Sequence, residues 1–305
     1  MKKNWIKRVA GSLAACAIVV GVLGSQTAVA GSVRPSDLPV KASPVTGVTV
    51  YSNDKAVIDA SNLAEGYVLV KYTGGKNTRI KVQISKGSTV YTYNLNNTGA
   101  QETFPLTEGN GAYTVKVFEN TSGSKYALAY SADLQVSLRN DFLPYLYPNQ
   151  YVNYTAGSTV VNKAAELTAG AASDLEKVNK VYFYVTDTLT YDYDLAANVK
   201  SGYVPNVENV LAVKKGICFD YAALMAAMLR SQNVPCKLVI GYAGDVYHAW
   251  IDVYVDNTGW VDKMIYFDGT DWTMMDPTFV STGNHSDAIL EYVTDSSNYT
   301  QKYAY

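Results

Sequence analysis

The chain has 305 residues, of which 48% are hydrophobic and 17% charged, so it is long enough for two domains and is not compositionally disordered. Residues 1–30 carry four basic residues and no acidic one, so their removal changes 25 basic against 27 acidic residues into 21 against 27, a balance of −6. This balance disfavours nucleic acid as a partner.

Residues 1–30 predict a cleaved secretory signal. A basic start precedes the apolar run VAGSLAACAIVVGVLG, and the small-residue site AVA ends at Ala30. Lipidation at Cys16 is the alternative, but the apolar run continues past that position. No later segment approaches the ~20 apolar residues that a membrane span requires. We therefore expect a secreted or cell-surface protein of bacterial type, without a transmembrane span in the mature chain.

The segment after the signal predicts a linker followed by an all-β domain. Residues 31–47 contain three prolines and little apolar periodicity, which is typical of an extended linker. From residue 48 to residue 138 apolar residues alternate with polar ones, as Ile80, Val82 and Ile84 do in RIKVQISKG. Turn signals separate these runs, so residues 48–138 predict an immunoglobulin-like antiparallel β-sandwich.

This sandwich concentrates no catalytic residue types, so we expect it to be a separate spacer or adhesive module. Its tyrosines leave two interpretations open, because such residues stack on sugars but are also common as packing residues on strands. These tyrosines are Tyr67, Tyr91, Tyr93, Tyr113 and Tyr126.

We expect residues 139–172 to connect the sandwich to a second domain, residues 173–305. After residue 173 apolar residues recur at helical spacing, and Ser173 with Glu176 forms a plausible capping box for this helix. A second helix is expected from Cys218 to about Ser231, followed by the strand sequences CKLVIGYA, HAWIDVYV and TMMDPTF. The predicted fold class is α+β, with helices packed on an antiparallel sheet.

Cys218 lies where a thiolate is stabilised, because the first turn of a helix offers unpaired N–H groups and the positive end of the helix dipole. Asp220, two residues on, is interpreted as a structural acid at the helix start. Cys236 is the other cysteine of the mature chain, and we expect it to pack within a strand. Two cysteines are too few for a disulfide framework in an exported protein of this length.

A nucleophilic thiol needs a base, and the chain has only two histidines. His248 belongs to the predicted strand HAWIDVYV, on one face with Trp250 and Asp252, whereas His285 belongs to a polar loop and is expected at the surface. Asp276 in MMDPTF is the candidate for orienting the imidazole. We interpret the competing acids as solvated strand-end or turn residues. Chemistry alone does not decide between them and Asp276. These acids are Asp252, Asp256, Asp268 and Asp271.

The segments GICFDYAALMAAMLRSQNVPCKLVIGYA, HAWIDVYV and MMDPTF resemble, in this order, the core of the transglutaminase-like superfamily, relatives of the papain-like cysteine proteases. The resemblance covers residues 173–280, about a third of the chain. It implies a Cys-His-Asp triad in which Cys218 is the nucleophile, His248 the base and Asp276 the orienting acid.

The family also implies an oxyanion donor upstream of the nucleophile, for which Tyr191 and Tyr193 in TLTYDYDLA are the candidates. Two features depart from the family pattern. Cys236 stands where relatives carry a small residue, and the insertion at residues 256–272 predicts a long hairpin that shapes the substrate cleft.

The resemblance implies an exported cysteine-dependent enzyme that transfers acyl groups from peptide, protein or cell-wall amides. Water resolving the thioester would make it a peptidase or amidase, which we expect; an amine would make it a protein-glutamine transglutaminase that cross-links surface proteins. A non-catalytic surface-binding protein on this scaffold is the second alternative. We expect no cofactor and no metal site, because the cysteines and histidines lack the close pairing of zinc ligands.

Overall fold

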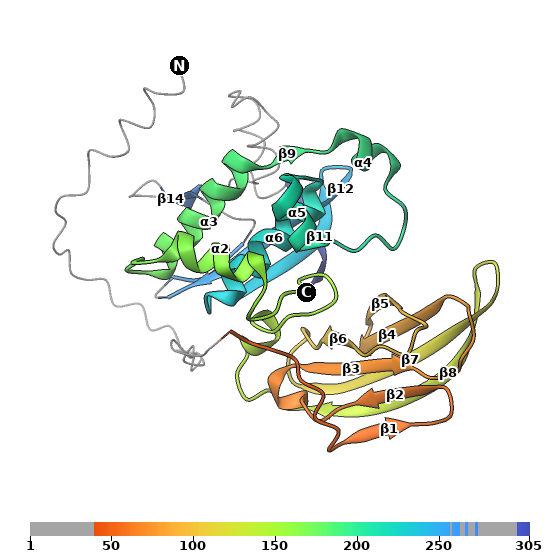
Figure 1. Cartoon of the computed structure of the whole chain (residues 1–305). Helices are drawn as coiled ribbons and strands as arrows, with labels where there is room; N and C mark the ends of the chain where they lie inside the picture. The colour runs from red at the N-terminus through yellow and green to blue at the C-terminus, as the bar shows by residue number, and fades with distance from the viewer. Residues whose placement is uncertain (1–39, 257, 263–265, 268–271, 274–297) are drawn as a thin grey trace, which may run out of the picture.

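The computed structural model describes residues 40–256, 258–262, 266–267, 272–273 and 298–305 (Figure 1). A β-rich part, coloured orange to yellow, lies beside a part in which green helices cover a blue sheet (Figure 1). Within the described residues, no helix combines the length and the apolar character that crossing a membrane would need.

Residues 50–136, all of them described, form two four-stranded sheets with antiparallel pairing throughout. The first has the order β1 (Val50–Ser52), β2 (Ala56–Asp59), β3 (Tyr67–Tyr72) and β6 (Glu102–Pro105). The second has the order β5 (Thr89–Leu95), β4 (Ile80–Lys86), β7 (Gly111–Ser122) and β8 (Lys125–Val136). Ile80, Val82 and Ile84 are buried between the sheets, so the period-two pattern correctly predicted the inner face of β4.

The tyrosines of the sandwich are packing residues. Tyr67, Tyr91, Tyr93 and Tyr113 are all buried, which leaves their rings no surface on which a sugar could stack. Tyr126 is half-buried, and the Arg79 guanidinium lies 6.0 Å from the centroid of its ring. Burial therefore decides the open question for four of the five tyrosines.

The expected connection at residues 139–172 holds two elements of its own, the 3-10 helix η2 (Leu143–Tyr145) and the helix α2 (Thr159–Thr168). Val160, Val161 and Ala164 of α2 are buried, and α2 packs against the central helix of the second part. The helical cluster thus begins before residue 173, because the apolar face of α2 has to be covered by its neighbours.

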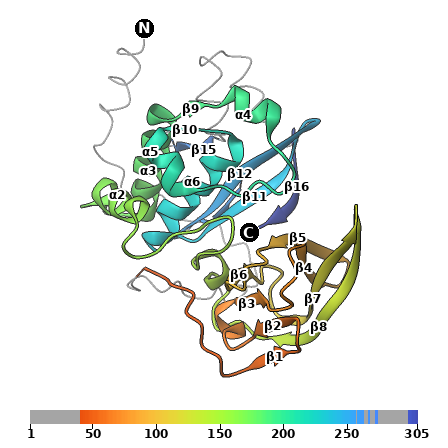
Figure 2. The same cartoon turned by 45° about the vertical axis from the view of Figure 1, so that its right-hand side comes forward.

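The helix α6 (Cys218–Ser231) is the centre of the second part (Figure 2). Residues 220–231 are all buried between the sheet and the surrounding helices. These helices are α2, α3 (Asp174–Thr188) and α5 (Val207–Val213), and the short helix α4 (Tyr193–Asn198) lies between α3 and α5 in the chain. The Ser173 hydroxyl accepts a hydrogen bond from the Glu176 N–H (3.2 Å), which confirms the predicted cap of α3.

The sheet beneath α6 is antiparallel, and this α+β arrangement confirms the predicted fold class. Within the described residues its strand order is β13 (Gly259–Val261), β12 (Val246–Val255), β11 (Cys236–Ala243) and β16 (Tyr299–Ala304). Short pairs join β9 (Thr190–Tyr191) to β10 (Lys215–Gly216) and β14 (Tyr266–Phe267) to β15 (Trp272–Thr273). Residues 274–279 of the expected third strand lie outside the described residues.

The sandwich is packed directly against the second part. The Thr107 hydroxyl donates a hydrogen bond to the Ala304 carbonyl (2.9 Å), and the Tyr91 ring lies 5.2 Å from that of Tyr303 and 5.4 Å from that of Tyr305. Buried residues of both parts belong to one continuous apolar cluster. This packing was not predicted, because strand alternation does not reveal which residues meet a second domain.

Candidate active site

The start of α6 is held by a buried carboxylate. Ile217, in extended backbone, precedes Cys218, which is the first residue of the helix. The Asp220 carboxylate accepts a hydrogen bond from the Ile217 N–H (2.9 Å) and another from the Tyr203 hydroxyl (2.8 Å). Asp220 is fully buried, and this burial raises the pKa of its carboxyl. Asp220 therefore has the structural role at the helix start that the sequence predicted.

Gly216 leaves room for this carboxylate. A Cβ atom on Gly216 would lie 2.6 Å from the Asp220 Cβ and 3.0 Å from its Oδ2, closer than real side chains approach. Gly216 pairs with Tyr191 in the parallel bridge of β10 and β9, and its carbonyl accepts a hydrogen bond from the Asp192 N–H (2.9 Å). The glycine, the cysteine and the aspartate of GICFD thus form one local structure that presents Cys218 at the helix end.

The two cysteines differ in accessibility. Cys218 is half-buried, whereas Cys236 on β11 is fully buried. Burial raises the pKa of the Cys236 thiol to about 12, so this thiol stays protonated at neutral pH. Of these two, only Cys218 is both accessible and at the N-terminus of a helix.

The two candidate oxyanion tyrosines are in different surroundings. Tyr191 is half-buried and lies beside Gly216 through the β9–β10 pairing. Tyr193 is 65% exposed at the start of α4, with its ring centroid 5.0 Å from that of Tyr191. The pairing brings Tyr191 nearer than Tyr193 to the segment that leads into α6.

His248 is 6% exposed on β12, and its ring lies 6.4 Å from that of Trp250, with the planes 25° apart. Trp250 packs in a small apolar cluster with Val239 and Tyr299, whereas Ala249 packs in the large cluster that includes α6. His248 therefore shares the Trp250 face of the strand, as alternation predicted. The hydrogen bonds between described residues include none from Cys218 to His248, so their pairing remains a prediction.

The expectation for Asp252 is wrong. Asp252 was expected to be a solvated strand-end residue, but it is only 3% exposed. The reason is that β12 is an inner strand of the sheet, and both of its faces are covered. Asp256 is exposed at the end of β12, as expected. The residues Asp268, Asp271, Asp276 and His285 lie outside the described residues.

Sequence reasoning overlooked Tyr247, which precedes His248. Tyr247 is 59% exposed, and alternation puts it on the same face of β12 as Ala249, the face that packs with α6. Its ring lies 5.5 Å from that of Tyr242 on β11. Burial raises the pKa of Tyr247, and charge interactions with Tyr303, with Tyr242 and, least, with Cys218 add to the rise. The alternation that placed His248 on one face of β12 also places Tyr247 on the other.

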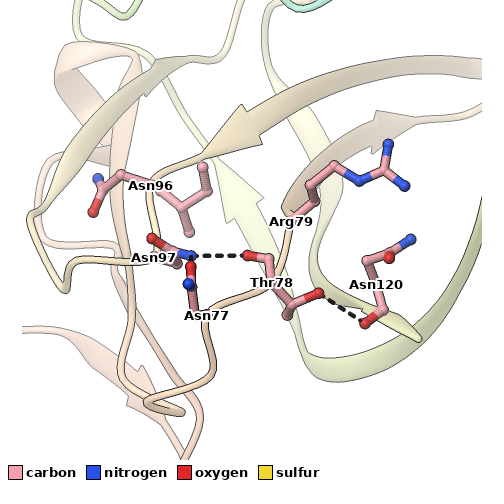
Figure 3. Close-up of a pocket in the computed structure, with 7 residues that line it drawn as sticks. Asn77, Thr78, Arg79, Asn96, Asn97 and Asn120 are labelled. Atoms are coloured by element: carbon pink, nitrogen blue, oxygen red, sulfur yellow. Dashed lines mark hydrogen bonds between the residues drawn. The ribbon is translucent and has the colours of Figure 1, made fainter. Parts of the chain in front are cut away.

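Two pockets of the described surface have no lining residue from the start of α6. A shallow pocket of about 480 Å³ at one end of the sandwich is polar, and the Asn97 amide donates a hydrogen bond there to the Thr78 carbonyl (3.1 Å; Figure 3). A second pocket of about 180 Å³ lies between the sandwich and the sheet, where Lys237 Nζ is 3.8 Å from the centroid of the Trp260 ring. Within the described part of the chain, no three potential metal ligands gather to hold an ion.

Comparison with known proteins places residues 161–263 in the family described as the transglutaminase-like superfamily. The mouse kyphoscoliosis peptidase is 29% identical over 114 residues, which are 33% of this chain and 17% of that protein. The uncharacterized protein YebA of Bacillus subtilis is 24% identical over 148 residues, 42% of this chain and 20% of that protein. The chain thus spans a fifth or less of these two relatives.

Among solved structures, the match with the periplasmic domain of TgpA from Pseudomonas aeruginosa covers 77% of this chain and 99% of that domain. Its sequence identity is 14% and the TM-score is 0.35. The match with a transglutaminase from red sea bream covers 75% of this chain and 53% of that protein, with 12% identity and a TM-score of 0.29.

Proposed function

Because residues 161–263 form a domain of the transglutaminase-like superfamily, we propose that this protein is a cysteine-dependent acyl-transfer enzyme with Cys218 as its nucleophile. The observation that carries the proposal is the position of Cys218. It is the accessible first residue of a buried helix, and the Gly216–Asp220 arrangement holds that helix start in place.

In the proposed reaction the Cys218 thiol gives its proton to His248, and the resulting thiolate attacks the carbonyl carbon of an amide. The C–N bond breaks as the His248 imidazolium protonates the leaving amine, and the acyl group remains on sulfur as a thioester. Asp276 orients the imidazole. Water then loses a proton to His248 and attacks the thioester, so that the C–S bond breaks and the acid is released.

This assignment requires the His248 imidazole to come within hydrogen-bond reach of the Cys218 sulfur during the reaction. Catalytic hydrogen bonds are often long or poorly aligned in the free enzyme and tighten in the substrate complex. The order of the three sequence motifs supports the triad, and substitution of the two histidines tests it.

We propose hydrolysis as the dominant outcome, with a peptide or cell-wall amide as the substrate. Water is present at about 55 M, so a transferase has to exclude it or hold an amine at high effective concentration. Tyr247 lies on the face of β12 that packs with α6 and is 59% exposed, which supports an open site. The mouse relative is named a peptidase, which agrees with this outcome. The expected signal at residues 1–30 supports a substrate outside the cytoplasm. Cross-linking of protein glutamines is the alternative.

The deciding experiment supplies a glutamine-containing peptide and a labelled primary amine at millimolar concentration, then compares the free acid released with the amine incorporated. We expect more acid than incorporated amine, and no product from Cys218→Ala. Incorporation that outpaces hydrolysis would make the protein a transglutaminase. If neither product formed with a panel of peptide and cell-wall amides, the non-catalytic alternative would gain support.

The histidines provide an internal comparison. His248→Ala should abolish turnover and move the pH dependence of Cys218 alkylation towards that of an ordinary thiol, because the imidazolium partner is lost. The control His285→Ala should leave both measurements near wild type. Loss of turnover on changing His285, with His248 dispensable, would contradict the triad.

A further inference from the structure

Phe219, the residue after the nucleophile, is held between two tyrosine rings. Its ring centroid lies 5.3 Å from that of Tyr151, with the planes at 59°, and 6.4 Å from that of Tyr203, with the planes at 63°. Cys218 and Phe219 are consecutive residues in the first turn of α6. The packing of the Phe219 ring therefore acts on the same helical turn that carries the Cys218 thiol.

Tyr151 links this contact to the core of the sandwich. Its ring stacks on that of Tyr93, with centroids 5.7 Å apart and planes at 27°, and meets the Tyr305 ring edge-on at 4.8 Å. Tyr93 is fully buried and packs in turn against Phe104, at 4.8 Å. The backbone of Tyr151 is fixed as well, since its N–H donates a hydrogen bond to the Asn149 side chain (3.0 Å).

Asn94, the residue after Tyr93 on β5, begins a second set of contacts that leads to the start of α6. The Asn94 side chain lies so close to Gly202 that a Cβ atom on Gly202 would collide with the Asn94 amide nitrogen. The next residue, Tyr203, contacts Phe219 and donates its hydroxyl to Asp220, which caps Ile217. Strand β5 of the sandwich thus reaches the first turn of α6 through two adjacent residues, Tyr93 and Asn94.

From this arrangement we propose that Tyr151 is a positioning residue for Cys218, through which the sandwich holds the nucleophile in place. The inference rests on the proposed function only in taking Cys218 as the nucleophile. The sandwich thereby takes part in the active site, although the sandwich supplies no member of the triad. Aromatic pairs of this geometry are favourable beyond their buried area, so the ring of Tyr151, and not its hydroxyl, is the group that acts.

The test compares Tyr151→Leu with Tyr151→Phe and with the matched control Phe142→Leu in the full mature chain. Phe142 is a buried ring of the same connecting segment, but it packs against Tyr254 (4.3 Å) and Trp260 (6.2 Å). The readout is the rate of iodoacetamide alkylation of Cys218 as a function of pH, followed by peptide mapping. Thermal unfolding of each variant reports the general loss of stability.

We expect Tyr151→Leu to raise the midpoint of the alkylation profile by a few tenths of a pH unit, because a misplaced thiolate loses part of an interaction with the helix N-terminus that amounts to about 0.3–1 kcal/mol. Tyr151→Phe should restore the wild-type profile. Phe142→Leu should lower the melting temperature and leave the profile unchanged.

Two failures can be told apart. If Tyr151→Leu lowers the melting temperature as Phe142→Leu does but keeps the wild-type profile, Tyr151 is a structural residue and the inference is overturned. If wild-type Cys218 itself titrates like an ordinary thiol, the proposed function fails, whatever Tyr151 does.

Discussion

Gly216→Ala is the substitution for which the structure gives the most definite expectation. The backbone of Gly216 is outside the left-handed region, so alanine adds no backbone strain, and the whole effect comes from the added methyl group. That methyl group would lie 2.6 Å from the Asp220 Cβ, about 1 Å closer than an ordinary carbon–carbon contact. Asp220 has to move, and its hydrogen bonds to Ile217 and Tyr203 lengthen or break.

Overpacking of this kind costs about 1–3 kcal/mol, and one weakened hydrogen bond to a buried carboxylate adds about 1 kcal/mol. The expected loss is about 2–4 kcal/mol, which corresponds to a fall of roughly 5–15 °C in melting temperature for a domain of this size. Catalysis should fall further, on the order of 10²-fold, because a displacement of about 1 Å at the helix start misplaces the nucleophile.

The assays are differential scanning calorimetry and the rate of Cys218 alkylation. Gly157→Ala is the control, because no atom lies within 4 Å of a Cβ atom at Gly157 and its φ is not positive. If Gly216→Ala unfolded within 2 °C of Gly157→Ala and kept wild-type Cys218 reactivity, the steric account of the helix start would be refuted.

Two further predictions concern titrating groups. Iodoacetamide at neutral pH should label Cys218 and spare Cys236, whose pKa burial raises to about 12; equal labelling in peptide maps would contradict the assignment. Burial alone would raise the pKa of Glu119, but hydrogen bonds from Tyr72, Lys76 and Lys55 lower it to about 2. The resulting stability, about 2 kcal/mol after allowance for the exposed lysines, should be present above pH ~4.5 and lost as the pH falls towards 2. Urea titrations of wild type and Glu119→Gln should therefore differ at pH 7 and converge at pH 2; parallel curves would contradict this role.

Local patterns were sufficient for several elements. The alternation in RIKVQISKG predicted which residues of β4 are buried, and Ser173 predicted the cap of α3, because both depend on neighbours within the same element. The structural role of Asp220 followed from its place two residues after Cys218, for the same reason. The order of the three motifs also indicated the family that the comparison of residues 161–263 supports.

Contacts between distant segments could not be predicted in this way. From the sequence we expected Asp252 to be solvated, but it is buried. We also expected residues 139–172 to be a connecting segment, but their helix α2 packs on α6. Each of these facts depends on a surface contributed by another part of the chain. Alternation assigns a residue to a face, but it does not say whether that face meets solvent, a helix or a second domain.

In the candidate site, too, local sequence decided some features and tertiary packing decided others. Sequence motifs alone singled out Cys218 and His248, because the chemistry of a thiol and its base restricts the residue types that can serve. Only the tertiary structure brought Tyr151 against Phe219 and the Tyr93 ring of the sandwich against Tyr151. These contacts join residues 58 or more positions apart, and no local pattern records them because they exist only once the two parts have packed together.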